Sequence, residues 1–376
     1  CLEMPRQREQ LLLIVFLLSS LLPLTQGTAL HANFSIAAYL PEWRYESANW
    51  ESMCEHTTHL ILFSLEIGSK GEIAALDRIP AKDLLSQARS ACTKHGTALL
   101  ICFGGNGRSN GFSRMVRDGA MRAKFVGELV NLCETYGFDG VDYNWEYPGY
   151  IFGRGYLAES EVIADYEGLE NLLKDTKQAF EGRGWAITMA YYPDSRQEAL
   201  LAQYNAAKYA DLLHMMSYDQ NGKHHSTFKY ASQTVRQGIK ILPAAKLTLG
   251  LPFYGRHTGT GDWTTYEDIV QNYAPLNASR DFVPSMDGSR HKIGFNGIKT
   301  IKQKTKHAIK NGLGGVMIWE IGQDCRLNPV TYRGRTHVRT CPHGENSSLS
   351  VAILRAMKSR GVDRVKFKGH EEKKEL

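Results

Sequence analysis

Short apolar runs alternate with longer stretches of helical periodicity along most of the chain. Most of the runs are apolar without alternation, which is typical of parallel strands that are covered on both faces. Helix-length connections separate them, which predicts repeated βα units, an α/β fold and a (β/α)8 barrel. The eight candidate strands are Ser35–Leu40, His59–Leu65, Ala98–Phe103, Gly140–Trp145, Ala186–Tyr191, Leu212–Ser217, Leu247–Leu251 and Gly315–Trp319.

The connecting segments carry amphipathic helices and one insertion. Apolar positions at helical spacing predict helices over Pro80–Lys94, Ala120–Tyr136, Ile163–Arg183 and 347–360. The segment of about 257–311, between the seventh and eighth strands, is longer than a usual connection and predicts a small α+β insertion. Several strands end in polar or aromatic residues, and the carboxyl ends of the strands are where such barrels keep their active sites.

The first residues have the pattern of a targeting segment. Arg6 and Arg8 precede an apolar run, Leu11–Leu24, and small residues follow near Gly27, so residues 1–27 are expected to be a signal peptide. The run is shorter than the ~20 residues that a membrane span needs, although an uncleaved signal anchor remains the alternative. Residues 28–360 then form the barrel, and 361–376 form a basic tail.

Composition and charge exclude several classes of protein. Hydrophobic residues make up 43% of the chain and charged residues 22%, a globular balance that argues against disorder, collagen and coiled coils. The net charge of +6 is mild and scattered, so a nucleic-acid partner is not expected. We also expect a monomer without stable insertion into a membrane.

Entry into the secretory pathway makes disulfides and glycans possible. Six cysteines follow the signal peptide, and among their 15 pairings Cys325 with Cys341, across a polar loop, is the favoured one. Cys102 lies within an apolar strand and is expected to be a buried thiol. Three N-x-S sequons begin at Asn33, Asn277 and Asn346. No zinc motif occurs, and His224-His225 in a polar loop is a weak metal candidate, so no metal or cofactor is expected.

Alternating polar residues mark the fourth strand. Side chains two apart share a face of a strand, so Asp142, Asn144 and Glu146 point one way and Val141 and its alternate neighbours the other. Three polar side chains inside a barrel are costly unless they bind each other or a ligand. For Glu146, at the strand end with Asp142 and Asn144 beneath it, we expect a pKa raised toward the range of a general acid. The alternatives are a self-satisfied polar ladder and an exposed edge strand.

This segment resembles the family 18 glycoside hydrolases, which include chitinases and chitinase-like lectins. Their fourth barrel strand carries D-x-x-D-x-D-x-E, and here Asp139, Asp142, Asn144 and Glu146 stand at those places. Four further motifs of that family occur in order: Phe103-Gly104-Gly105, with Cys102 where Ser is usual, Met216-Ser217-Tyr218-Asp219, Gly250 to Arg256 (GLPFYGR) and Gly314 to Trp319 (GGVMIW). The resemblance runs from about Ser35 to Lys358 and implies a TIM barrel.

The resemblance also implies a mechanism without an enzyme nucleophile, because family 18 uses the N-acetyl oxygen of its own substrate. Glu146 is then the acid and base, with Asn144, Asp142 and Tyr218 as the other catalytic residues. Trp319 is the expected floor under the sugar, and Tyr39 and Phe63 line the barrel mouth. The remaining substrate-binding candidates are Gly104, Gly105, Asp139, Tyr147, Met216, Asp219, Tyr254 and Arg256.

Asn144 is the departure from the family pattern that matters. It keeps hydrogen-bonding atoms but lacks the negative charge that stabilises a developing cation and raises the pKa of a neighbouring carboxyl group. We therefore expect a weakened enzyme or a displaced pH optimum, acting on β-1,4-linked N-acetylglucosamine. The alternatives are a chitinase-like lectin and a hydrolase of the chitobiose core of N-glycans.

The last four residues suggest a second possible localisation signal. Lys373-Lys374-Glu375-Leu376 resembles the K-D-E-L retention signal, with Lys in second place. The expectation is therefore an extracellular protein, with the lumen of the endoplasmic reticulum as the alternative. A chance ending of a lysine- and glutamate-rich tail would leave the protein secreted.

Overall fold

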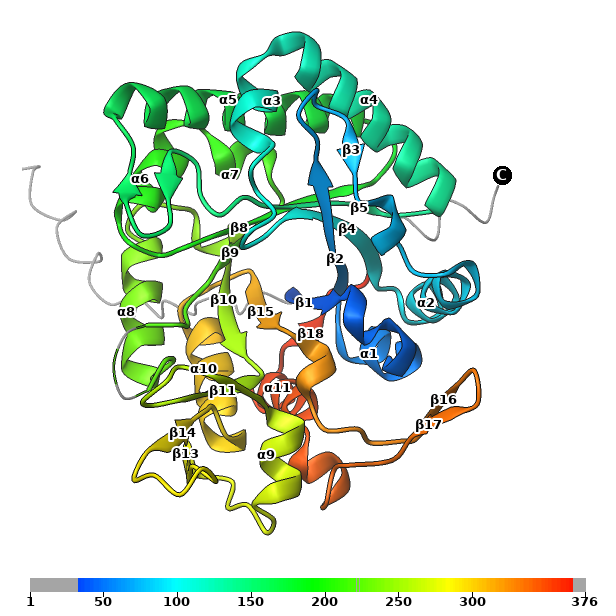
Figure 1. The fold of residues 1–376 in the computed structure, drawn as a ribbon, viewed down its shortest axis with the longest axis vertical. Coiled ribbons are helices and arrows are strands. Elements are labelled where there is room, and N and C mark those ends of the chain that lie inside the picture. Colours follow the sequence, from blue (N-terminus) through cyan, green and yellow to red (C-terminus); the bar gives the residue numbers. More distant parts are fainter. Residues whose placement is uncertain (1–32, 221, 223, 368–376) are drawn as a thin grey trace, which may run out of the picture. The chain divides into compact units, whose positions relative to one another are not determined.

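A computed structural model describes residues 33–220, 222 and 224–367 of the chain (Figure 1). The predicted signal peptide, residues 1–27, and the terminal Lys373-Lys374-Glu375-Leu376 lie outside the described residues. None of the helices formed within the described ranges combines the length and apolar character needed to cross a bilayer.

Eight parallel strands form a closed barrel, as the apolar runs predict. They are β1 (Asn33–Pro41), β2 (His59–Ile67), β4 (Ala98–Gly104), β5 (Gly140–Asn144), β8 (Ala186–Tyr191), β9 (Leu212–Met215), β10 (Leu247–Pro252) and β15 (Gly315–Trp319). Neighbours pair in the order β1-β15-β10-β9-β8-β5-β4-β2, and β1 also pairs with β2, which closes the ring. β5 and β15 are therefore opposite each other, as are β1 and β8.

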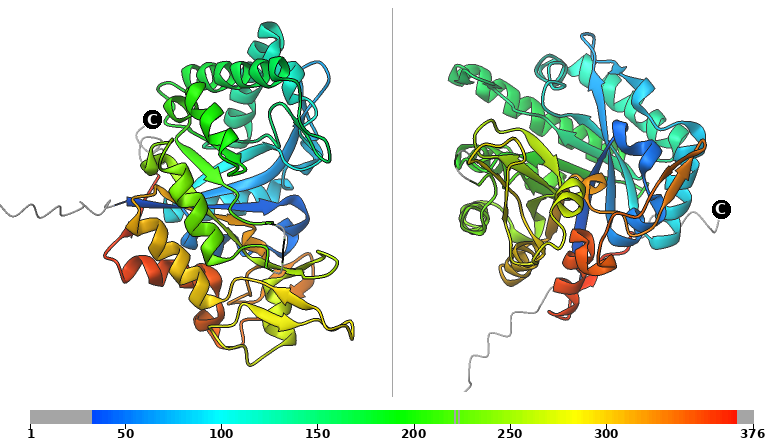
Figure 2. Two further views of the ribbon diagram at one scale, coloured as in Figure 1. Left: turned by 90° about the vertical axis from the view of Figure 1, so that its left-hand side faces the viewer. Right: turned by 60° about the horizontal axis from the view of Figure 1, so that its bottom comes forward.

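Helices cover the outside of the barrel, as Figures 1 and 2 show. The predicted helices agree with α2, α4, α5 and α11 apart from a few terminal residues. The helices are α1 (Trp50–His56), α2 (Lys82–His95), α3 (Phe112–Arg117), α4 (Gly119–Tyr136), α5 (Glu159–Ala179), α6 (Arg196–Gln203), α7 (Ala206–Tyr209), α8 (Phe228–Gly238), α9 (Tyr266–Asn272), α10 (Ile298–Lys310) and α11 (Leu349–Lys358).

Alternation along β5 separates two cores. Val141, Tyr143 and Trp145 are buried in the large core between the strands and the helices. Asp142 and Asn144 point to the other face, into the barrel, where a smaller core contains Tyr39 and Cys102. The edge-strand alternative for this segment is therefore wrong, because β5 pairs with both β4 and β8.

A small antiparallel sheet is inserted between β10 and β15, coloured yellow to yellow-green in Figure 2. Its strands are β11 (Tyr254–His257), β12 (Trp263–Thr265), β13 (Phe282–Pro284) and β14 (Lys292–Gly294), with α9 between β12 and β13. The predicted limits of about 257–311 differ from this arrangement. The sheet begins earlier, at Tyr254, and α10 packs against α8, α11 and β10 as a helix of the barrel.

Two disulfides close loops on the barrel. Cys325–Cys341 confirms the favoured pairing, and Cys54–Cys92 joins α1 to α2. Cys102 is a buried thiol, as expected.

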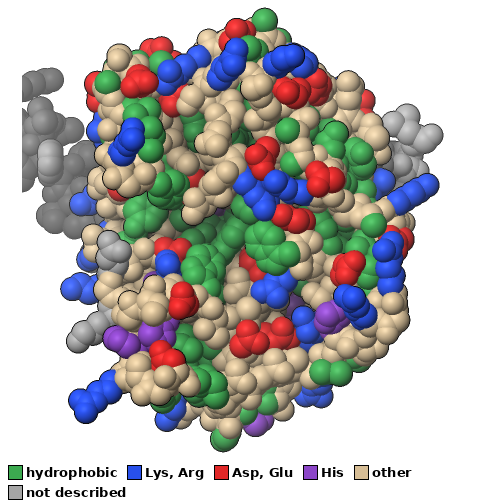
Figure 3. Space-filling model, in the orientation of Figure 1, with side chains coloured by type: hydrophobic (Ala, Val, Ile, Leu, Met, Phe, Trp, Pro, Cys, Tyr) green, Lys and Arg blue, Asp and Glu red, His purple; other side chains and the backbone are tan. Residues whose placement is uncertain are grey.

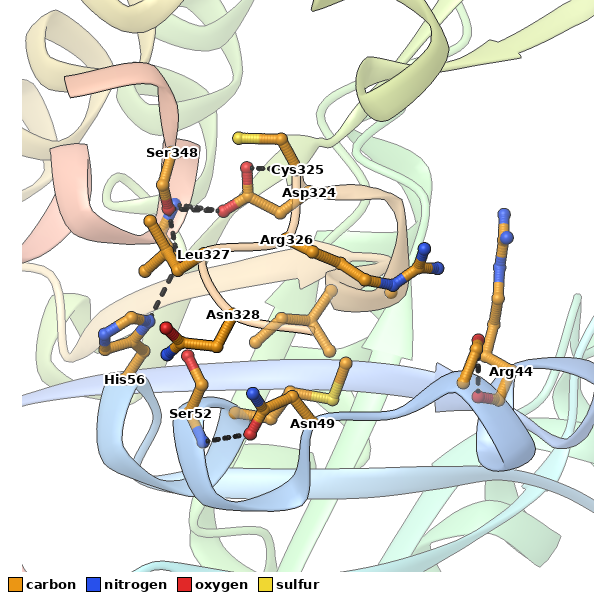
Figure 4. Close-up of a pocket in the computed structure, with 15 residues that line it drawn as sticks. Arg44, Asn49, Ser52, His56, Asp324, Cys325, Arg326, Leu327, Asn328 and Ser348 are labelled. Atoms are coloured by element: carbon orange, nitrogen blue, oxygen red, sulfur yellow. Dashed lines mark hydrogen bonds between the residues drawn. The ribbon is translucent and has the colours of Figure 1, made fainter. Parts of the chain in front are cut away.

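A small pocket of about 50 Å³ lies beside the first of these disulfides, between α1 and the start of α11. Figure 4 shows Asp324 there, directed at Ser348. Its carboxylate accepts hydrogen bonds from the Ser348 hydroxyl at 2.7 Å and from the backbone N–H groups of Leu349 and Ser350 at 2.9 Å. A carboxylate at a helix N-terminus satisfies the free N–H groups of the first turn, so Asp324 stabilises the start of α11.

Candidate active site

A cavity of about 360 Å³ opens at the carboxyl ends of the barrel strands, within the range of ligand pockets. Figure 3 shows a hollow near the middle of this face, in which hydrophobic side chains gather. Nine of the residues predicted from the sequence line the cavity: Tyr39, Phe63, Asn144, Glu146, Tyr147, Met216, Tyr218, Asp219 and Trp319.

Glu146 lies just beyond the end of β5, where the strand delivers its side chain to the cavity. Burial, and to a smaller extent the nearby Asp219 carboxylate, raise the pKa of the Glu146 carboxyl to about 7. A hydrogen bond with Asn144 acts in the opposite direction. A carboxyl group with a pKa near neutrality can both donate and accept a proton at physiological pH, as a general acid and base must.

Asn144 is buried directly below Glu146 on the same face of the chain. Its side chain hydrogen-bonds Glu146. Its Oδ1 is buried and has no hydrogen-bond partner within the described part of the chain. An unpaired buried acceptor is costly, so this atom is available to an N–H donor that enters the cavity.

Asp142 lies one layer deeper and does not line the cavity. Its carboxylate accepts hydrogen bonds from the Tyr39 hydroxyl at 2.9 Å and the Thr188 hydroxyl at 2.7 Å. Burial raises the pKa of the Asp142 carboxyl, while these bonds and one from Cys102 oppose the rise. His214 Nε2 lies 3.7 Å away, and burial lowers the pKa of this histidine to about 3, so it is neutral. Asp142 therefore belongs to a buried polar layer in the barrel below the cavity.

A second set of side chains holds Asp219 at the wall of the cavity. Its Oδ1 accepts a hydrogen bond from the Tyr254 hydroxyl at 2.8 Å and lies 3.0 Å from Arg256 Nη1 and 3.2 Å from His225 Nδ1. These three partners keep the pKa of Asp219 below its usual value although burial raises it. Tyr254 and Arg256 thus act through Asp219 rather than line the cavity.

Aromatic rings form one side of the cavity. Trp319 at the end of β15 contacts Phe63 and Tyr39, with ring centroids 4.8 and 5.4 Å apart. Tyr218 is buried nearby, and its hydroxyl lies 3.7 Å from the sulfur of Met317. These rings meet edge to face or tilted and make one side of the cavity apolar.

Three other predicted residues shape the site from outside the cavity. Gly105 has φ +100°, and a Cβ there would lie 2.3 Å from the Phe63 ring. Gly104 brings the chain close to the Asn144 carbonyl, to which the Gly105 N–H donates at 2.6 Å. Asp139 precedes β5 and accepts from the Leu99 N–H at 3.0 Å, so it ties β5 to β4 rather than facing a ligand.

Sequence reasoning missed six lining residues: Trp43, Asn106, Arg108, Ala190, Tyr192 and Trp263. Trp43 and Trp263 are 58% and 49% exposed, which is unusual for tryptophan. This exposure distinguishes them in the structure, not in the sequence. The Arg108 guanidinium makes a bidentate pair with Glu42 and lies 5.3 Å from the centre of the Phe63 ring. Asn106, Arg108 and Tyr192 come from loops, Trp43 from a short 3-10 helix and Trp263 from the start of β12, and the pattern of the barrel strands predicts the positions of none of these five. Ala190 lies within β8.

The two histidines considered for a metal have other partners. His225 contacts Asp219, and His224 Nε2 donates to the Phe295 carbonyl at 2.8 Å. Across the described ranges, no group of three or more His, Cys, Asp or Glu side chains is arranged to hold a metal ion.

Comparison with known proteins gives a family match over residues 35–324, to the glycosyl hydrolases family 18. The chain is 24% identical over 391 aligned residues to "Probable chitinase 2" of Drosophila melanogaster, which covers 85% of this chain and 78% of that protein. It is 26% identical to Chitinase A1 of Niallia circulans, over 60% of this chain and 40% of that protein. The match therefore spans less than half of that bacterial relative.

Solved structures share the fold. Catalytic domain 2 of the Ostrinia furnacalis Group II chitinase superposes with a TM-score of 0.67 at 20% identity, over 88% of this chain and 98% of that one. The Group IV chitinase of the same insect, in complex with allosamidin, gives a TM-score of 0.68 at 19% identity, over 88% of this chain and 100% of that one. These similarities establish the (β/α)8 barrel.

Proposed function

This chain belongs to the glycosyl hydrolases family 18, and we propose that it hydrolyses β-1,4-linked N-acetylglucosamine in chitin or chitooligosaccharides. The observation that carries the proposal is Glu146, a half-buried carboxyl group with a pKa of about 7 that lines a cavity together with Trp319. Relatives named as chitinases support the choice of substrate, as does one fold neighbour solved with a bound N-acetylchitooligosaccharide.

The proposed reaction retains configuration and is assisted by the substrate. Protonated Glu146 donates its proton to the glycosidic oxygen as the acetamide oxygen of the substrate attacks the anomeric carbon. The C–O bond to the leaving sugar breaks, and an oxazolinium intermediate forms. Ionised Glu146 then takes a proton from water, whose oxygen attacks the anomeric carbon, and the acetamide and the protonated Glu146 are restored.

Asn144 and Tyr218 orient the acetamide group in this proposal. The free Oδ1 of Asn144 suits the acetamide N–H, and the Tyr218 hydroxyl suits the acetamide oxygen. Trp319 provides an apolar surface for the sugar ring at the point of cleavage. The polar layer around Asp142 keeps Asn144 in place.

A chitinase-like lectin is the second candidate, and Asn144 is the observation that favours it. Its neutral amide lacks the charge that stabilises an oxazolinium ion, and loss of one such electrostatic element commonly costs ~10²–10³ in rate. The cavity would then bind oligosaccharides with little turnover. Hydrolysis of the chitobiose core of N-glycans is a variant of the enzyme proposal with the same chemistry.

The proposed location is the secretory pathway, with an extracellular protein as the main outcome. The apolar Leu11–Leu24 run and the Cys325–Cys341 disulfide support it. Retention in the endoplasmic reticulum through the terminal Lys373-Lys374-Glu375-Leu376 is the alternative. Deletion of these four residues increases secretion if the signal acts and leaves secretion unchanged if it does not.

Proton NMR of chitotetraose digestion tests the proposed reaction. The first products carry a β-configured reducing end if the acetamide group assists cleavage, because two inversions retain configuration. Initial appearance of the α-anomer contradicts the mechanism. Binding of chitotetraose without any product supports the lectin instead.

A further inference from the structure

An aromatic hairpin follows the proposed acid directly along the chain. β6 (Tyr150–Ile151) and β7 (Gly155–Tyr156) form an antiparallel pair only a few residues after Glu146. Its base is fixed, because the Gly149 N–H donates to buried Asp165 at 2.8 Å. The Leu157 N–H closes the hairpin on the Gly149 carbonyl, also at 2.8 Å.

The rings of this hairpin continue the wall of the cavity. Tyr147 lines the cavity, and its ring centroid lies 5.7 Å from that of Tyr150 and 5.6 Å from that of Phe152. Tyr192, another cavity residue, lies 6.1 Å from Tyr147 on the other side. Edge and tilted contacts of this kind fix the rings relative to one another. The aromatic surface therefore extends from the cavity to the tip of the hairpin.

The outer end of this surface is open to solvent. Phe152 is 52% exposed and Ile151 is 41% exposed. Single exposed apolar side chains are ordinary, but exposed apolar side chains continuous with a ligand cavity mark an interaction site. Burial of such a side chain against a ligand removes apolar area from water and stabilises the complex.

The barrel geometry indicates which part of a sugar chain reaches the hairpin. Trp319 is the last residue of β15, and Tyr147 follows β5 on the opposite side of the ring of strands. Glu146 protonates the glycosidic oxygen, so the scissile bond lies beside it. With the sugar that is cleaved lying over Trp319, the leaving part of the chain extends past Tyr147. Pyranose rings present apolar C–H faces, which aromatic rings contact well.

We propose that the β6–β7 hairpin is an additional binding site for β-1,4-linked N-acetylglucosamine units on the leaving-group side, with Phe152 as the outer contact. This proposal rests on the proposed substrate class and adds that the protein favours long chains over short ones. An exposed phenylalanine at the hairpin tip gains a partner only when the bound chain is long enough to reach it.

Calorimetric titration of the full chain with the Glu146→Gln substitution tests the proposal without hydrolysis. The ligands are the dimer and the hexamer of N-acetylglucosamine, and the added substitutions are Phe152→Ala, Phe152→Trp and Phe228→Ala. Phe228 is a matched control, because it is 39% exposed on α8, in the outer ring of helices. Thermal unfolding of each variant confirms that it is folded.

We expect Phe152→Ala to weaken hexamer binding about threefold to tenfold and to leave dimer binding unchanged. Phe152→Trp keeps the affinity for the hexamer, and Phe228→Ala leaves the affinities for the dimer and the hexamer unchanged. Unchanged hexamer binding in Phe152→Ala, or an equal loss for both ligands, overturns the hairpin site alone. Absence of binding of either ligand by the Glu146→Gln protein overturns the proposed function and the hairpin site with it.

Discussion

Asn144 lies between two carboxyl groups on one face of the chain, with Asp142 below it and Glu146 above it. The pKa of Glu146 is nevertheless near 7, because burial and the charge on Asp219 supply the rise that a carboxylate at position 144 would otherwise supply. In the proposed mechanism the neutral amide therefore leaves Glu146 with a pKa suited to an acid and removes the negative charge that would face the oxazolinium ion.

Asn144→Asp restores that charge, and we expect it to raise kcat on a chitooligosaccharide by up to about 100-fold. The measurement is the initial rate at saturating chitotetraose for both proteins. A matched Asn106→Asp variant places a carboxylate at the exposed rim of the cavity and controls for a general effect of charge. Equal or lower turnover in Asn144→Asp would show that the amide suits a different substrate or geometry.

The pH profile follows from the same carboxyl group. In the proposed mechanism cleavage needs protonated Glu146. We therefore expect kcat/KM to be at its maximum well below the pKa of about 7 and to fall tenfold per pH unit above it. In Asn144→Asp a neighbouring carboxylate disfavours ionisation of Glu146, so the alkaline limb moves to higher pH. Rates on a fluorogenic chitobioside across pH 4–9 check both profiles. A limb that does not move, or that moves to lower pH, contradicts the assignment.

At the scale of elements, the apolar runs predicted the strands well. β8 and β15 have the predicted bounds. Their short, continuous apolar runs are typical of parallel strands that are buried on both faces. Alternation along β5 likewise placed Asp142 and Asn144 inside the barrel. The β6–β7 hairpin was not predicted, because its strands are two residues long and stay folded through ring contacts.

Lys304 on α10 is a buried lysine that connects α10 to the loop after β9 through hydrogen bonds. Its Nζ donates to the Ser226 carbonyl at 2.9 Å, the Ser226 hydroxyl at 2.7 Å and Asn296 Oδ1 at 2.6 Å. The same loop carries Asp219 and His225. Lys304→Met keeps the length of the side chain but removes three hydrogen bonds and leaves the buried Asn296 Oδ1 without this donor, so we expect a loss of about 3 kcal/mol in the free energy of unfolding.

Urea denaturation of both proteins measures this difference. Lys299→Met is the control, because that lysine is exposed on the same helix and its loss should change the unfolding free energy by under about 0.5 kcal/mol. If Lys304→Met and Lys299→Met are equally stable, the lysine does not hold the loop.

At the scale of the whole molecule, the ordered motifs predicted the barrel, and the ring of eight strands closes as they require. Much of the cavity was also predictable, since Glu146, Tyr218 and Trp319 follow strands whose carboxyl ends must meet. Trp43, Arg108 and Trp263 were not, because these residues lie outside the barrel strands and come together only in the folded chain. The Cys54–Cys92 pairing was open for the same reason, since it depends on how α1 packs against α2.

The central claim is that Glu146 is the acid of a working glycosidase. Hydrolysis of fluorogenic chitobioside and chitotrioside by the unaltered chain and by Glu146→Gln tests it most directly, with chitooligosaccharide binding measured on the same proteins. We predict release of the fluorophore by the unaltered chain, a loss of at least about 100-fold in Glu146→Gln, and binding retained in both. Absence of hydrolysis by the unaltered chain with binding retained, or equal rates in the two proteins, would contradict the claim.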